Sequence, residues 1–238
     1  MAFTTLLEIC SRACDELSIA RQTSYIGSVT PDARTLLACA NSAGRDLMRS
    51  HEWSFLHTLG TITTANGTSS YSLASDYDRM IADTGWDRTN DWMMVGPDTP
   101  QINRYLNESG VAQTGPRKRF RLAGTSITIW PTPTATETLV YEYISNKWAR
   151  SASSTAQTEF AADTDTTLFD PDLMKLEVIW RYRKSKGMAF DDAMAEAMAV
   201  RQSRIAADQG GTTLDLAPRP GAQFIELENV PDNNWSLS

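Results

Sequence analysis

Apolar side chains recur every three or four positions in four stretches of the chain, the spacing that places them on one face of an α-helix. Two of the predicted helices come early in the chain and two come late. Their ranges are residues 5–17, 30–52, 170–186 and 191–208. The first two carry separate apolar stripes, so we expect them to pack against each other. The third is apolar nearly all round, so we expect it to be buried.

Capping residues mark the starts of two of these helices. Thr30 and Asp170 can each accept a hydrogen bond from the first helical amides, and each is followed by a proline, which fits the first helical position. The first of these helices runs through Trp53 and Phe55 directly into strand-like sequence. We therefore expect residues 30–55 to join helical structure to β structure.

After this stretch the hydrophobic pattern changes to the alternation that is typical of strands. Asn66-Gly67 stands between two runs rich in Thr and Ser and predicts a hairpin, because both turn positions favour positive φ. Residues 117–122 and 126–130 predict a second strand pair, and residues 139–144 predict a further strand. We expect roughly five or six short strands in this part of the chain.

This order of elements predicts an α+β fold. Residues 1–56 and 168–211 should form a four-helix bundle, with residues 57–150 as a β-rich insert between its second and third helices. Residues 151–167 are rich in Ser, Ala and Thr and carry acidic but no basic side chains, so we expect an acidic linker. Residues 212–238 contain several prolines and predict an extended C-terminal arm.

The arm carries apolar side chains that have no core of their own: Phe224, Ile225, Leu227 and Trp235. Apolar groups exposed on an extended segment usually need a partner. We therefore expect the arm to dock on another protein.

Charge and length restrict the classes of function. The chain has 238 residues and a net charge of −7, which argues against a general nucleic-acid binder. The same charge suits a wall that DNA slides past, where repulsion is useful. The N-terminus has no basic start followed by an apolar run, and no segment has about 18 uninterrupted apolar residues. We expect a protein that is made in a cytoplasm and works there or in an assembly built there.

Candidate chemistry is sparse. The three cysteines, Cys10, Cys14 and Cys39, are interpreted as small core residues, since no zinc-ligand spacing includes them. Cys39 and His51 lie twelve positions apart on one predicted helix, too far to act as a nucleophile and base. No phosphate-binding or hydrolase motif is present. We expect neither an enzyme nor a metal or cofactor site.

Two groups of basic side chains remain as candidates for contacts. Arg117, Arg119 and Arg121, with Lys118 between them, could touch phosphates from one face of a strand. We favour the alternative that they protect an edge strand or form ion pairs between subunits. The polar face of the second helix carries the other group, Arg34, Arg45 and Arg49, which would by itself indicate plain solvent exposure.

Several stretches, taken in order, carry a resemblance to a known family. They are HEWSF at 51–55, RFRLAGTSITIWPTP at 119–133, VYEYISNKWARS at 140–151 and DPDLMKLEVIWRYRKSKGMAF at 170–190. The chain resembles the head–tail adaptors of short-tailed bacteriophages, the tail-tubular-A-like portal adaptors. These motifs are packing residues and not catalytic signatures.

The resemblance implies a homo-oligomeric ring in the virion, commonly a dodecamer, beneath the portal protein and above the tail nozzle or tail fibre proteins. The ring would continue the channel through which the genome is packaged and ejected, without sequence-specific DNA binding. The apolar residues of the arm would bind the portal, and the two arginine groups become candidate ring contacts. The alternative is a tail-associated module that binds a receptor or carbohydrate through Trp86 and Trp92 of the β insert.

Overall fold

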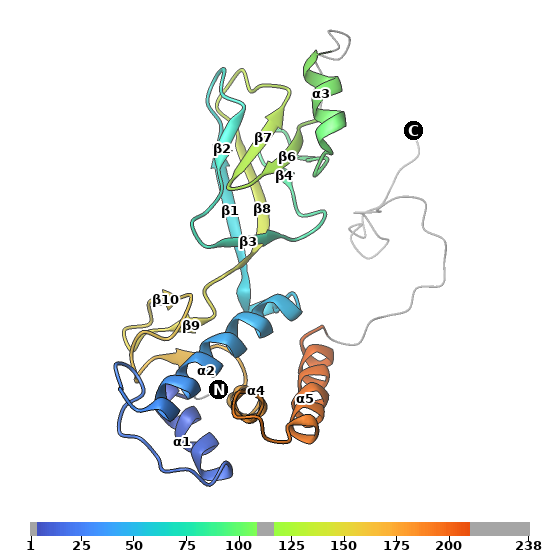
Figure 1. Ribbon diagram of the computed structural model, residues 1–238. Coiled ribbons are helices and arrows are strands. Elements are labelled where there is room, and N and C mark those ends of the chain that lie inside the picture. Colours follow the sequence, from blue (N-terminus) through green and yellow to red (C-terminus); the bar gives the residue numbers. More distant parts are fainter. Residues whose placement is uncertain (1–3, 109–116, 210–238) are drawn as a thin grey trace, which may run out of the picture.

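The computed structural model describes residues 4–108 and 117–209. These residues form a helical body and a β domain that stands above it (Figure 1). The helices are α1 (Leu6–Glu16), α2 (Pro31–Ser50), α3 (Pro100–Glu108), α4 (Pro171–Ser185) and α5 (Asp191–Gln209). All but α3 belong to the helical body (Figure 1). The mixed α and β content predicted from the sequence is confirmed.

The helices α1 and α4 begin with a side-chain cap, and α2 does not. Thr5 accepts a hydrogen bond from the Glu8 amide at the start of α1. Asp170 accepts from the first amides of α4. The expected cap at Thr30 is absent, because the Thr30 hydroxyl lies 3.0 Å from the Ser28 hydroxyl instead. Pro31 still fits the first position of α2, so α2 begins where the sequence places it.

The helical body is arranged around α4, which packs against α1, α2 and α5. α4 is buried on most sides, as its apolar sequence predicts. α5 packs chiefly on α4, and its buried residues are the small side chains Ala193 and Ala197. The other three helices of the body therefore pack around α4, and a regular four-helix bundle is not confirmed.

Two antiparallel sheets form the β domain. The larger contains β1 (His57–Thr63), β8 (Thr138–Ser145), β3 (Tyr77–Met80), β4 (Trp86–Asp87) and β5 (Trp92–Met93). The smaller has the order β2 (Ser70–Ser72), β7 (Ser126–Trp130), β6 (Arg119–Ala123). The predicted strand pair around Gly124 is confirmed as β6 and β7, and Gly124 takes the left-handed φ of +60° that the turn requires.

The hairpin predicted at Asn66-Gly67 is wrong. Gly67 has a φ of +76°, as a tight turn needs, but the strands on its two sides belong to different sheets. β1 pairs with β8 over its whole length, and β2 pairs with β7. The turn thus carries the chain from one sheet to the other, and the inward-facing Ile62 and Leu73 meet in the core between them.

The segment 151–167, expected to be a linker, has regular structure. β9 (Ala149–Arg150), β10 (Ala156–Gln157) and β11 (Thr166–Thr167) form a small third sheet. The backbone of this segment also binds α1, since the Leu6 and Leu7 amides donate to the Asp165 and Asp163 carbonyls. Its acidic side chains accept hydrogen bonds from neighbouring amides, a use that composition does not reveal.

Two hydrophobic cores meet at β8. Ile144 belongs to the core of the helical body, whereas its neighbour Tyr143 belongs to the core of the β domain. Just beyond β8, Trp148 is fully buried against α2. A Cβ atom added to Gly44 would lie 2.3 Å from the Trp148 ring, so the glycine is what allows this close approach.

Candidate functional site

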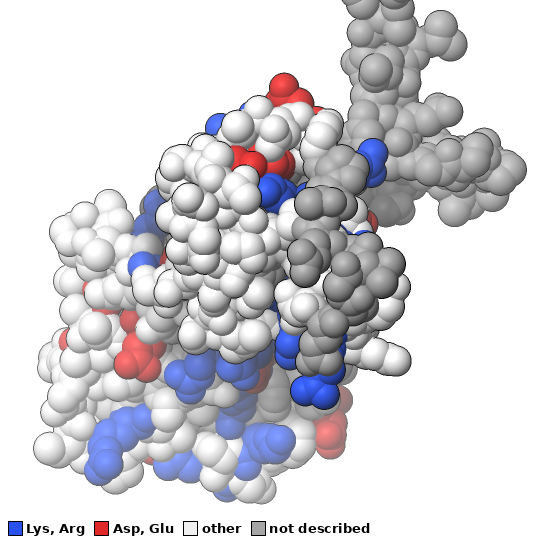
Figure 2. Space-filling model, turned by 90° about the horizontal axis from the view of Figure 1, so that it is seen from above, with Lys and Arg blue, Asp and Glu red and all other residues white. Residues whose placement is uncertain are grey.

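The outward face of α2 carries an exposed row of arginines. Because the apolar stripe of α2 faces the core, Arg34, Arg45 and Arg49 point away from it and are exposed. Arg45 lies 3.8 Å from Glu159, and both of these side chains are largely exposed. Within residues 4–108 and 117–209, neither Arg34 nor Arg49 has an ion pair. Basic side chains gather along one side of the helical body (Figure 2).

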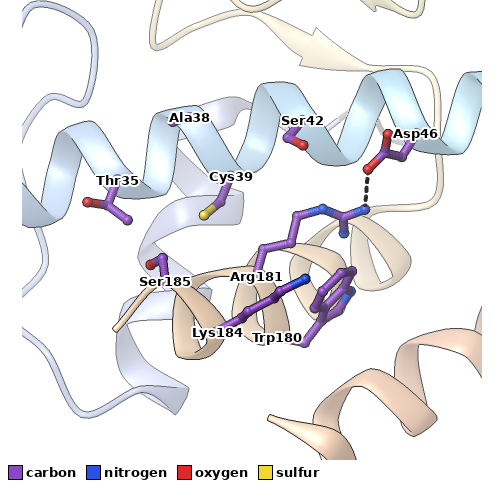
Figure 3. A pocket seen from close by; sticks show the side chains of 9 residues that line it. All are labelled: Thr35, Ala38, Cys39, Ser42, Asp46, Trp180, Arg181, Lys184 and Ser185. Atoms are coloured by element: carbon purple, nitrogen blue, oxygen red, sulfur yellow. Dashed lines mark hydrogen bonds and ion pairs between the residues drawn. The ribbon is translucent and has the colours of Figure 1, made fainter. Parts of the chain in front are cut away.

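A groove of about 570 Å³ runs beside this row, between α2 and α4. Thr35, Cys39, Ser42 and Asp46 line it from α2 (Figure 3). Trp180, Arg181, Lys184 and Ser185 line it from α4 (Figure 3). Burial raises the pKa of the Cys39 thiol and so disfavours its reactive thiolate form. The groove is open to solvent and has a mainly apolar lining with charged side chains at its margins.

A buried carboxylate lies behind the groove and joins three helices. Glu177 of α4 is fully buried. Its side chain accepts hydrogen bonds from Trp180 at 2.8 Å, from Arg181, and from the Arg201 Nε atom at 3.0 Å. Arg181 also donates to Asp46 of α2 at 2.8 Å, the dashed contact in Figure 3. This network links α2, α4 and α5 through charge-assisted hydrogen bonds.

The C-terminal end of α5 is hydrogen-bonded to the segment that follows α2. The Asp208 carboxylate accepts hydrogen bonds from the Ser54 hydroxyl at 2.6 Å and the Ser54 amide at 2.9 Å, and it lies 3.3 Å from His51. Burial raises the pKa of the Asp208 carboxyl, but the bonds from Ser54 and the nearby His51 outweigh it and hold the pKa below its usual value. One turn earlier on α5, Arg204 pairs with Asp170, the capping residue of α4, at 2.9 Å.

Aromatic rings fill the junction between the two parts of the molecule. The ring of Phe169, just before α4, lies 5.6 Å from Trp53 and 5.5 Å from Phe55. Trp53 is buried and donates its indole N–H to a carbonyl of α2, whereas Phe55 is 42% exposed. From the β domain, Arg79 donates to the His51 carbonyl at 2.7 Å and so satisfies an end of α2.

Comparison with known proteins gives this arrangement a family. The chain matches the family model described as SU10 adaptor protein over residues 4–219, a span that includes every helix and strand above. The chain belongs to the SU10 adaptor protein family. A search of curated proteins finds no match. The resemblance to phage head–tail adaptors is confirmed, and the restriction to short-tailed phages stays a prediction.

Membership in this family implies a structural component of the virion that interacts with portal and tail proteins. Cys10, Cys14 and Cys39 are free and buried. Among these residues, no helix is long and apolar enough to cross a bilayer, and no cluster of His, Cys, Asp or Glu has the form of a metal site.

The basic run on β6 is divided among separate contacts. Arg119 donates to Asp98 with its Nε atom at 2.9 Å, and Lys118 pairs with Glu137 at 2.9 Å. Arg121 lines a hollow beside α3, and Arg117 is exposed. The two basic side chains in the middle of the run are thus occupied within the chain. As ring contacts, Arg117 and Arg121 are better candidates than Arg119.

The other residues that the sequence indicates as candidates are the apolar residues of the arm and the two tryptophans of the β insert. Phe224, Ile225, Leu227 and Trp235 lie outside the described residues. Trp86 is half-buried and Trp92 is 42% exposed, so Trp92 is the more accessible of the two rings. The buried Glu177 was not singled out from the sequence. Its signal is an acid within an apolar helix, followed by an arginine four positions later.

Proposed function

We propose that this protein forms a homo-oligomeric ring, commonly a dodecamer, beneath the portal of a short-tailed phage. The ring continues the DNA channel, serves genome packaging and ejection, and connects the portal to the tail nozzle or tail fibre proteins. The family match over residues 4–219 is the observation that carries the proposal. The exposed Arg34, Arg45 and Arg49 on α2 support it, because exposed charges on a rigid helix suit contacts between subunits, and among the described residues Arg34 and Arg49 have no ion pair within the chain.

Mass photometry of the protein alone and mixed with its portal ring tests this function. The expected result is a discrete heavy species in the mixture whose mass equals one portal ring plus a fixed number of adaptor copies. A mixture that shows only free adaptor and free portal would refute the proposal.

The portal contact is assigned to the C-terminal arm, through Phe224, Ile225, Leu227 and Trp235. Two variants test it: a chain ending at Gly211, and a full-length chain with serine at all four positions. Both should keep the circular dichroism of the parent, and both should lose portal binding. Portal binding equal to that of the parent in either folded variant would sink this assignment.

The channel is proposed to pass DNA without holding it. With a net charge of −7, the ring has few phosphate contacts to offer, so the genome can slide. A filter-binding assay with duplex DNA at physiological salt should detect no affinity. Tight binding that weakens steeply with added salt would contradict a low-friction channel.

A further inference from the structure

The outward face of α5 carries acidic side chains, opposite in charge to the arginine row of α2. On the side that faces away from α4, α5 exposes Asp192, Ala195, Glu196 and Ala199. Within the part of the chain that the structure describes, Asp192 and Glu196 take part in no ion pair. This acidic face is defined here by these four residues.

The spacing of charge is the same on the two faces. Asp192 and Glu196 are four positions apart on α5, and Arg45 and Arg49 are four positions apart on α2. Each pair therefore spans about 6 Å along its helix, at a rise of about 1.5 Å per residue. Two acids on one helix can meet two arginines on another without any change of register.

Small side chains also lie on the two helices near the charges. Ala195 and Ala199 lie on the acidic face, and on α2 Ala38 and Ser42 lie between Arg34 and Arg45, one to two turns before the proposed pair. Small residues at a crossing allow two helix axes to approach closely. The groove of about 570 Å³ beside the arginine row adds a hollow into which a neighbouring helix can settle.

The two faces cannot meet within one chain. α4 packs against both α2 and α5 and lies between them (Figure 1). The complementary faces therefore require two copies, and a contact between two different surfaces of one chain is the type that closes into rings.

We infer that the ring contact is head-to-tail, with α5 of one copy packed across α2 of the next. Asp192 and Glu196 of one copy face Arg45 and Arg49 of its neighbour. This inference rests on the proposed ring and names the surfaces that build it.

Charge reversal tests the pairing. One variant carries Arg45→Glu and Arg49→Glu, and the other carries Asp192→Lys and Glu196→Lys. Opposed like charges should lower the fraction of portal-bound rings at least about tenfold for either variant alone. An equal mixture should restore rings, because each reversed face then meets a complementary face of the other variant.

The positions are exposed, so both variants should retain the parent's circular dichroism. Glu142→Lys, on the exposed side of β8, is the control and should assemble like the parent. Normal rings from either reversed variant alone, or no recovery in the mixture, would overturn the inference while the ring itself stands. If the parent protein forms no ring on the portal, the proposed function fails first and this pairing fails with it.

Discussion

The buried carboxylate of Glu177 is where a small chemical change should have a large effect on stability. Replacement by glutamine keeps the size of the side chain and removes its charge. The Arg181 and Arg201 guanidinium groups then lose their shared anionic partner. Asp46 still neutralises Arg181 at 2.8 Å, and Arg201 is 20% exposed and can reach water.

The expected cost follows from these differences. Removing one partner of a buried ion pair typically costs about 3–5 kcal/mol. Because both arginines retain some compensation, we expect Glu177→Gln to lower the free energy of unfolding by about 3 kcal/mol, the lower end of that range. With a urea m-value of about 3 kcal/mol/M, this corresponds to a midpoint about 1 M lower.

Urea unfolding followed by circular dichroism at the helical minimum measures this loss. Hydrogen exchange locates it, since α5 depends on Glu177 through Arg201 and should lose protection before β8 does. Asp46→Asn is the matched control. The Asp46 side chain is 49% exposed, and an exposed pair of this kind is worth about 0–1 kcal/mol. A loss below about 1 kcal/mol for Glu177→Gln would refute the view that this carboxylate holds the helices together.

Two further predictions concern packing and pH. Gly44→Ala should lower the free energy of unfolding by about 2 kcal/mol. The added methyl group gains about 1 kcal/mol in helix propensity, but its clash with the buried Trp148 ring costs more. An increase in stability in the same urea assay would contradict this prediction. Burial raises the pKa of the Asp163 carboxyl, but the bonds from Ser24 and two backbone amides hold it below its usual value. Asp163 therefore stabilises the fold above about pH 4 and loses that effect as pH falls through its lowered pKa. Asp163→Asn should flatten the acid limb of the stability curve, and parallel limbs for the two proteins would refute the assignment.

Local sequence was sufficient for the four helices of the helical body. The sequence predicts a helix over residues 30–52, and α2 runs from Pro31 to Ser50. It predicts another over residues 170–186, and α4 runs from Pro171 to Ser185. Capping side chains, prolines and apolar periodicity act within a few residues of each helix end, so they can be recognised without the fold.

Strand partners depend on contacts far along the chain, and here local signals failed. Asn66-Gly67 does form a turn, but β1 finds its partner in β8, about 80 residues later. The partner of each strand depends on packing between apolar side chains that are distant in the sequence, and a local pattern contains no information on that packing. The same limit explains segment 151–167, whose acids become useful only beside the amides they bind.

For the candidate surface, exposure could be predicted and partners could not. The apolar stripe of α2 is enough to turn Arg34, Arg45 and Arg49 outward. Nothing in the run of basic residues at β6 shows that Arg119 is occupied by Asp98, since the two are 21 positions apart and are brought together by the tertiary fold. Glu177 illustrates the same point for a buried acid.

The way β1 and β8 connect the two cores also determines how the molecule carries load. Both strands leave the helical body side by side, with His57 paired to Ile144 at that end and Thr63 to Thr138 at the other. Tension on the β domain is therefore divided between the backbones of two adjacent antiparallel strands. The hydrogen bonds between them run perpendicular to the pull and bear little of it. The β domain is therefore held to the helical body by a paired two-stranded ribbon and not by a single chain segment.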